Sequence, residues 1–190
     1  MRSPARWSAF IVMFSVLTSA SCSRHRDLPS YGTVPAFALT DQFGAPFSSP
    51  AVLSGHVWVA DFFFTTCPGP CPRMSSQMHQ VQMALEKDEV RLVSFTVDPE
   101  HDLPPALQSY AKSFGAVAGV WYFLNGSRDR LQHLDRDVFQ LGDVDGSLQH
   151  STRLVLMDKH SQIRGYYLSS EPDAISRLIA DARSLLRDLT

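Results

Sequence analysis

Cysteine, net charge and long apolar runs are all scarce in this chain of 190 residues. It has three cysteines and a formal net charge of -2, with 17 lysines and arginines against 19 aspartates and glutamates. This balance argues against a broad basic surface of the kind that binds nucleic acid. Internal repeats and low-complexity tracts are also absent. Because 44% of the residues are hydrophobic, we expect one globular domain with a sizeable core.

The N-terminal segment lacks the roughly 20 consecutive apolar residues that a transmembrane helix comfortably needs. It does carry Arg2 and Arg6, then a shorter uncharged apolar run, and then small residues. This order is typical of an export signal, which is not part of the mature fold. We therefore expect residues 1–22 to direct export, and residues 23–36, which have little apolar pattern, to form a tether.

Three ways of processing the export segment remain open. Signal cleavage could follow Ala20, or Cys22 could be lipidated, because the "SAS" before it resembles a bacterial lipobox. A lipobox usually has Leu three residues before its cysteine, where this chain has Ser19. The third alternative is an uncleaved membrane anchor. Each of them exports the domain, which we expect on the periplasmic face of the cell envelope, anchored to the membrane.

Patterns of strand and helix type alternate through residues 37–190, the expected folded domain. "HVWVADFFF" is a near-continuous β-type run, as expected of a strand buried on both faces. A hairpin with its turn at residues 41–44 precedes it, and a second hairpin turns at residues 159–161. Ser169 or Ser170 is placed to cap the C-terminal helix. The order hairpin, β, α, β, α, β, α, β, β, α predicts an α/β sandwich.

Cys67 and Cys71, with three residues between them, lie where the first long strand gives way to a helix. Cys22 belongs to the export segment, so the exported domain holds this pair alone. If the helix begins near Pro70, its unpaired N–H groups and dipole would favour thiolate and lower the cysteine pKa. In an oxidising compartment the pair would tend to close into a disulfide. So short a loop makes that bond a poor stabilising crosslink.

The pair alone does not separate redox catalysis from metal binding, because both need thiolates. Thiol oxidoreductases usually have two intervening residues, and the Thr-x-x-Cys element of peroxiredoxins fits neither cysteine. Of the seven histidines, His150 stands out, since it opens the strand that in thioredoxin-like folds normally begins with a cis-proline beside the active cysteines. Two thiolates and one imidazole suit Cu(I), and with a further ligand Cu(II). The alternative is an ordinary loop histidine.

Four segments, in this order, resemble the SCO/SenC family of copper-binding proteins, which assist the assembly of cytochrome c oxidase. They are "FFFTTCPGPCPRM", "VSFTVDPEHDLP", "GVWYFLNGSRDRLQHL" and "HSTRLVLMD". Together they are far more specific than the two cysteines alone. The chain departs from the family pattern at Leu103, where a threonine is usual, and at Ser161, where a turn glycine is usual.

The resemblance implies a thioredoxin-like fold with a central mixed β-sheet, flanking helices and an N-terminal β-hairpin. It also implies copper, as Cu(I) or Cu(II), held by Cys67, Cys71 and His150. The implied partner is subunit II of cytochrome c oxidase, whose dinuclear CuA centre would receive copper or be kept reduced. A thiol reductase and other periplasmic copper carriers are further partners of this kind.

Asp98 and Asp102 have two interpretations. Asp102 is well placed to cap the helix that begins in "LPPALQSY", and Asp98 ends a strand. Alternatively, they form an acidic surface near the metal that tunes copper binding or docks a partner. A methionine series with helical spacing usually indicates core packing rather than copper trafficking; its members here are Met74, Met78 and Met83.

Three functions follow from these patterns. The leading hypothesis is a membrane-associated copper metallochaperone, which need not be an enzyme. The second is an enzyme, a thiol–disulfide oxidoreductase that reduces the cysteines of a copper-receiving partner. The third is a copper or redox sensor with no delivery role. His150 separates the first two, because a disulfide reductase does not need an imidazole ligand.

Overall fold

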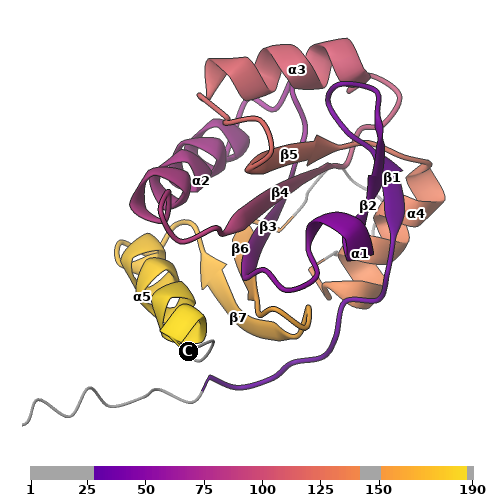
Figure 1. Cartoon of the computed structure of the whole chain (residues 1–190). Coiled ribbons are helices and arrows are strands. Elements are labelled where there is room, and N and C mark those ends of the chain that lie inside the picture. The colour runs from indigo at the N-terminus through magenta and orange to yellow at the C-terminus, as the bar shows by residue number, and fades with distance from the viewer. Residues whose placement is uncertain (1–27, 142–150, 188–190) are drawn as a thin grey trace, which may run out of the picture.

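A mixed five-stranded sheet forms the centre of the computed structural model, which describes residues 28–141 and 151–187 (Figure 1). The strand order is β5-β4-β3-β6-β7. β3, β4 and β5 are parallel, β6 runs antiparallel to β3, and β7 antiparallel to β6. Their bounds are β3 (Trp58–Phe63), β4 (Arg91–Thr96), β5 (Trp121–Leu124), β6 (Arg153–Met157) and β7 (Ile163–Leu168).

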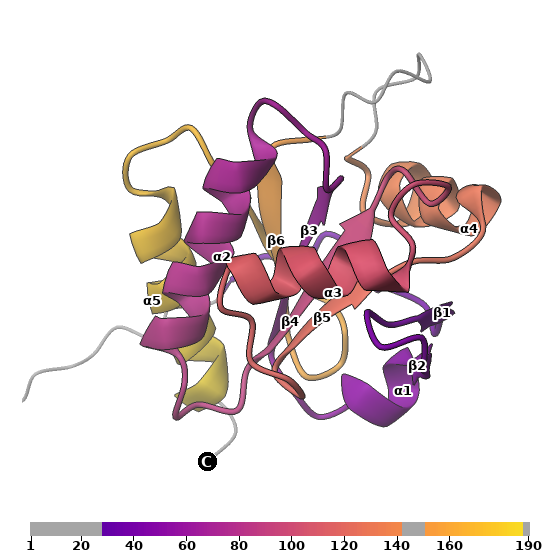
Figure 2. The same cartoon turned by 90° about the horizontal axis from the view of Figure 1, so that it is seen from above.

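Helices cover both faces of this sheet (Figure 2). One face carries α2 (Cys71–Ala84), α3 (Pro104–Ser113) and α5 (Ala174–Arg187). The other face carries the antiparallel hairpin of β1 (Ala38–Thr40) and β2 (Pro46–Ser48), the short helix α1 (Ser49–Val52), and α4 (Arg128–Gln132). The predicted α/β fold, with a central mixed sheet, flanking helices and an N-terminal hairpin, is confirmed.

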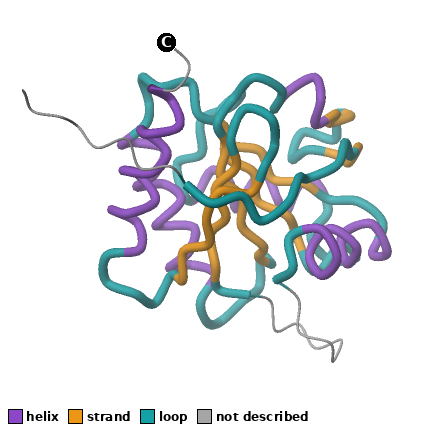
Figure 3. Tube along the Cα trace, turned by 90° about the horizontal axis from the view of Figure 1, so that it is seen from below, coloured by secondary structure: helices purple, strands orange, loops and turns teal. Residues whose placement is uncertain are grey.

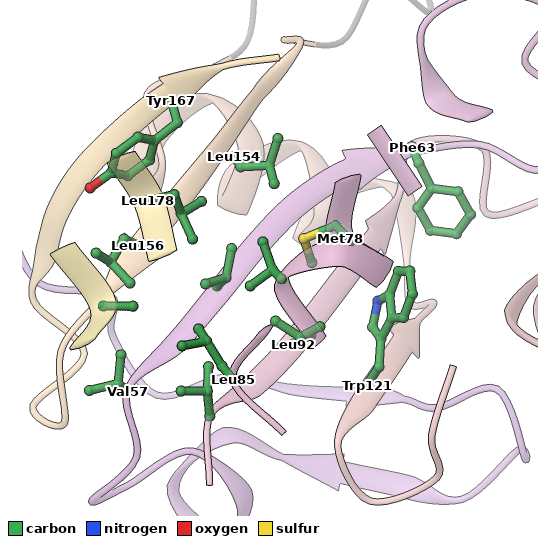
Figure 4. Close-up of a cluster of buried hydrophobic side chains, with 14 of the residues drawn as sticks. Val57, Phe63, Met78, Leu85, Leu92, Trp121, Leu154, Leu156, Tyr167 and Leu178 are labelled. Atoms are coloured by element: carbon green, nitrogen blue, oxygen red, sulfur yellow. The ribbon is translucent and has the colours of Figure 1, made fainter. Parts of the chain in front are cut away.

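The central strand β3 is buried along its whole length. Since side chains alternate between the two faces of a strand, Val59 and Phe63 pack on the side of α2, α3 and α5. Trp58, Ala60 and Phe62 pack on the opposite side. Figure 4 shows the first of these clusters, with Phe63 among its aromatic members. A strand with apolar partners on both faces explains why "HVWVADFFF" is almost uninterrupted in its apolar character.

The side chain of Asp41 organises the N-terminal hairpin. One of its carboxylate oxygens accepts the N–H groups of Phe43 and Ala45, each at 2.9 Å. Gly44 completes the turn at a φ of 77°, in the left-handed region that glycine adopts without steric cost. The turn predicted at residues 41–44 is confirmed.

The helix predicted over "SRDRLQHLDRDVFQ" is present but divided. The α-helical part α4 continues into a π-helical turn, η1 (His133–Val138). Leu131 and Leu134 are buried on this element and pack against the sheet. Across residues 28–141 and 151–187, this helix and all others are too short or too polar to cross a membrane.

Two predicted helix caps were wrong. The residue before α3 is Leu103, not Asp102, and no side chain caps the helix there. Likewise, α5 begins at Ala174, so Ser169 and Ser170 lie too far ahead to cap it. Asp102 and Ser169 instead have side-chain hydrogen-bond partners elsewhere in the fold. Ser169 accepts a hydrogen bond from Arg73 on α2 at 3.2 Å.

The segment 28–34, predicted as part of a tether, is packed on the domain. Tyr31 donates its N–H to the carbonyl of Ile163 at 2.9 Å, and Ile163 donates its own N–H to Gly32 at 2.8 Å. Leu28 and Val34 are buried. In Figure 3 this segment is the loop that crosses the near end of the strands. The folded domain therefore starts before residue 37, and the pairing is made by backbone groups, which leave little trace in the side-chain pattern.

Candidate metal centre

Cys67 and Cys71 lie together at the junction of β3 and α2, as predicted. α2 begins at Cys71, and Cys67 lies in the loop just before it. The N–H of Cys67 donates to the carbonyl of Phe64 at 3.2 Å, which turns the chain towards the helix. Both cysteines are thiols that are not joined in a disulfide. Cys67 is 9% exposed and Cys71 is fully covered, so the pair reaches solvent only through Cys67.

The pKa of Cys71 is raised, against the expectation that the helix N-terminus would lower it. Burial is the main cause, because it removes water from the thiolate, and hydrogen bonding with the thiol of Cys67 acts in the same direction. A hydrogen bond with the backbone of Phe64 favours the thiolate, but burial outweighs it. The prediction failed because it considered the helix end and not the depth at which Cys71 is buried. A bound metal cation would stabilise the thiolate against this cost of burial.

The donor atoms of this pair fit a soft metal. Two sulfur ligands favour Cu(I) over the hard cations that prefer oxygen. In the described ranges, histidine, cysteine, aspartate and glutamate side chains form no group of three or more that could hold a metal ion. The described residues therefore show no histidine or carboxylate that completes a three-ligand group with the two cysteines. His150 and Cys22 both lie outside the described residues, so their predicted roles stay predictions.

The topology brings the start of β6 to the end of the sheet that carries the cysteines. β6 pairs antiparallel with β3, with Ala60 opposite Val155 and Trp58 opposite Met157. Because the two strands are antiparallel, Arg153, the first residue of β6, lies near the C-terminal end of β3, which leads into the loop that holds Cys67. The chain enters β6 at the cysteine end of the sheet.

Asp61 on β3 was missed by the sequence analysis. Its carboxyl group is fully buried and accepts a hydrogen bond from the hydroxyl of Ser94 through one oxygen, while the other oxygen has no hydrogen-bond partner among the described residues. Burial raises the pKa of Asp61 to about 7, although the Ser94 hydrogen bond opposes the shift. The available signal was a charged residue within the otherwise apolar run "HVWVADFFF", since an unpaired carboxylate is costly to bury.

Asp102 and Asp98 have different neighbours. The buried carboxylate of Asp102 accepts hydrogen bonds from the N–H and the hydroxyl of Thr65 and from the hydroxyl of Thr96. Asp98 is bonded to His101 at 2.9 Å, near the surface. Asp102 is therefore attached to the loop that carries Cys67, and Asp98 is not.

The methionine series divides between the core and the surface. Met74 and Met78 on α2 are completely buried, whereas Met83 is 56% exposed. Met78 packs in the cluster that also contains Cys67 and Cys71. Core packing, as expected from the helical spacing, accounts for the two buried members.

Comparison with known proteins identifies the relatives of this chain. The SCO1/SenC family model matches residues 26–187. One relative, from Stutzerimonas stutzeri, carries a provisional name that refers to copper binding. It is 31% identical to this chain, and the match covers 73% of this chain and 71% of the relative.

Two solved structures are also similar. A SCO1/SenC family lipoprotein from Bacillus anthracis is 30% identical, with a TM-score of 0.75 over 84% of this chain and 98% of its own. BsSco is described as a member of the Sco family of cytochrome c oxidase assembly proteins, with a disulfide switch. It is 29% identical, with a TM-score of 0.72 over 85% of this chain and 96% of its own.

Proposed function

This chain belongs to the SCO1/SenC family, and on that premise we propose that it is a copper metallochaperone which assists assembly of the CuA centre of cytochrome c oxidase. The observation that carries the proposal is the pair of buried thiols of Cys67 and Cys71, which lie together at the start of α2. The name of the Stutzerimonas stutzeri relative refers to copper binding, and BsSco is described as belonging to a family of cytochrome c oxidase assembly proteins; both support the same function.

The proposed ligands are Cys67, Cys71 and His150. Two thiolates and an imidazole form a donor set that suits Cu(I) and, with a further ligand, Cu(II). The start of β6 at the cysteine end of the sheet is consistent with a ligand from the residue that lies just ahead of that strand in the sequence. The other histidines with described positions do not join the cysteines in a group able to hold a metal.

Delivery would proceed by exchange of ligands. Each copper–sulfur bond to Cys67 or Cys71 would be replaced by a bond to a ligand of the acceptor, here the CuA site of oxidase subunit II. Oxidation of the pair to a disulfide would remove both thiolates and empty the site, so the carrier would depend on a thiol reductant. Burial of the pair in the α2 side of the core would limit contact between the metal and water.

The proposed location is the periplasmic face of the membrane. The export segment supplies either a lipid on Cys22 or an uncleaved helix, and the lipoprotein nature of the Bacillus anthracis relative favours the lipid. Other copper carriers would then load the site from the same compartment.

A thiol–disulfide reductase is the second candidate, because Cys67 and Cys71 lie together as two thiols and BsSco is described with a disulfide switch. In that reaction the two thiols of Cys67 and Cys71 would become a disulfide. The disulfide of the partner would take up the two electrons and two protons and become two thiols.

Replacement of His150 separates the two candidates. In His150→Ala both thiols remain, so exchange with small disulfides should continue at the parent rate. The affinity for Cu(I), measured by competition with a chelator, should fall by more than the roughly 10–100-fold that is lost when only the support of a ligand is removed. His133→Ala is the matched control, because His133 is exposed on η1 and paired with Asp137.

Assembly of the CuA centre in cells then decides the function. Failure of assembly in His150→Ala, with thiol exchange intact, is expected for a copper carrier. Normal assembly in a variant that has lost copper would instead establish the reductase.

A further inference from the structure

We propose that Asp102 is a positioning residue for the metal site, acting through Thr65 to fix the loop that carries Cys67. This inference rests on the proposed copper function, and it concerns how the protein orients the Cys67 sulfur. Asp102 itself would not touch copper. The two residues come from the loop before α2 and the loop before α3, and they are far apart in the sequence.

The contact between Asp102 and Thr65 is made by several hydrogen bonds at once. The N–H of Thr65 lies 3.2 and 3.1 Å from the two carboxylate oxygens of Asp102, and the hydroxyl of Thr65 donates to the first of them. Asp102 is 0% exposed. Hydrogen bonds that a carboxylate accepts are shorter and stronger than those between neutral groups, and burial shields them from competition by water. Thr65 is therefore held in both position and orientation.

The other side of Asp102 is fixed to the sheet. Thr96, the last residue of β4, donates its hydroxyl to the second carboxylate oxygen. The side-chain amide of Asn125, just after β5, donates to the backbone carbonyl of Asp102 at 2.7 Å. The backbone N–H of Asp102 donates to the backbone carbonyl of Asp98 at 2.9 Å. Asp102 is therefore attached to the end of β4 through its carboxylate and to the residue after β5 through its backbone carbonyl, and the same carboxylate binds the cysteine loop.

The loop needs such a contact because its own backbone offers few donors. Pro68 and Pro70 have no N–H group, and residues 66, 68 and 69 are exposed. Beyond Pro70 the chain is fixed as part of α2, which places Cys71. Cys67 lies before that helix, two residues after Thr65, and its N–H is bonded back to Phe64 at 3.2 Å. The position of Thr65 therefore controls where the sulfur of Cys67 lies relative to that of Cys71.

Two variants remove this contact to different extents. Asp102→Asn replaces one acceptor oxygen with an NH2 group, which donates and cannot accept, so the hydrogen bonds that Thr65 and Thr96 donate to two oxygens can no longer all form. Thr65→Val keeps the shape and the backbone N–H and removes only the hydroxyl. Two variants are the matched controls. Thr65→Ser keeps a hydroxyl at position 65, and Asp98→Asn changes a neighbouring carboxylate that contacts His101.

Copper affinity and the absorption spectrum of the Cu(II)-loaded protein test the inference, at a temperature well below unfolding of every variant. We expect the Cu(I) affinity of Asp102→Asn to fall roughly 10–100-fold and that of Thr65→Val to fall less. We also expect both variants to shift the sulfur-to-copper absorption band, and both controls to match the parent. A purely structural role would lower the melting temperature and leave the band where it was.

Parent-like affinity and spectrum in Thr65→Val and Asp102→Asn would overturn the inference. If Asp102→Asn fails to fold, Thr65→Val alone decides. If the parent itself does not bind copper through Cys67 and Cys71, the proposed function fails. The positioning role of Asp102 is then tested in the metal-free protein, by the rate at which a thiol reagent modifies Cys67. A rate changed in both variants and restored in Thr65→Ser keeps the positioning role, and an unchanged rate removes it.

Discussion

Ser94 on β4 donates its hydroxyl proton to a carboxylate oxygen of Asp61 on β3, in the middle of the sheet. Ser94 in turn accepts the indole N–H of Trp121 at 2.9 Å. The Ser94 hydrogen bond occupies one oxygen of Asp61, and the other oxygen is buried with no partner among the described residues. Because an ionised carboxylate is costly in such a place, Asp61 is a buried acid that prefers to keep its proton.

Asp61 should make the protein less stable as the pH rises. Its folded pKa of about 7 lies above the ordinary value of 3.8, so between these values the native protein holds a proton that the unfolded chain releases. The contribution of Asp61 to the free energy of unfolding is therefore fully present below pH 4 and is lost as the pH rises towards 7. Between pH 5 and pH 8 we expect a loss of roughly 3 kcal/mol in the free energy of unfolding.

Urea unfolding of Asp61→Asn at both pH values checks this expectation. The variant should lose most of the pH dependence and be more stable than the parent at pH 8. Asp129→Asn, an exposed substitution on α4, should keep the parent's dependence. An Asp61→Asn protein with unchanged pH dependence would mean that the carboxyl group is ionised in the fold.

Met78→Ala should destabilise the domain by about 2–5 kcal/mol, because it leaves a cavity in the core. Met83→Ala on the same helix should change the free energy of unfolding by no more than about 0.5 kcal/mol, since Met83 is exposed. Chemical denaturation measures both. Both variants should bind as much copper per chain as the parent, and a copper deficit in Met83→Ala would give that thioether a role in metal handling.

Ser161 holds a conformation that glycine adopts more easily. Its φ is 56°, and its hydroxyl accepts the indole N–H of Trp58 at 3.3 Å. Ser161→Ala and Ser161→Gly both lose this hydroxyl, but only glycine avoids the cost of the left-handed region. We expect the glycine variant to be more stable than the alanine variant by about 1 kcal/mol in thermal unfolding. Equal stabilities would mean that the turn rearranges when the hydroxyl is removed.

Cys22→Ala should release the domain from the membrane if Cys22 carries a lipid. Cell fractionation should find the variant in the soluble periplasm, with its copper site intact. Membrane association that persists in the variant would establish an uncleaved N-terminal helix as the anchor.

The arrangement of strands and helices followed from patterns that are local in the sequence. The apolar run of β3, the turn at Asp41 and the helical spacing after Cys71 each depend on neighbouring residues. The position of the cysteines at the strand–helix junction could be predicted for the same reason, because a junction is set by two adjacent patterns.

The parts that failed depend on contacts between distant residues. Asp102 seemed a helix cap because serine, threonine and aspartate favour that position, and the competing partner, Thr65, is visible only once β3 and β4 are side by side. The pKa of Cys71 depends on depth, which results from the packing of the whole α2 layer. Residues 28–34 pair through backbone groups, which any sequence can offer.

That backbone pairing also fixes the N-terminal segment at one end of the sheet. Tyr31 and Gly32 are bonded to Ile163, and Ile163 lies opposite Met157, which lies opposite Trp58 at the start of β3. The cysteine loop follows the other end of β3, the length of a six-residue strand away, or about 20 Å. An N-terminal membrane attachment would therefore hold the domain by its far end and direct the thiols away from the lipid surface, towards a partner that projects from the same membrane.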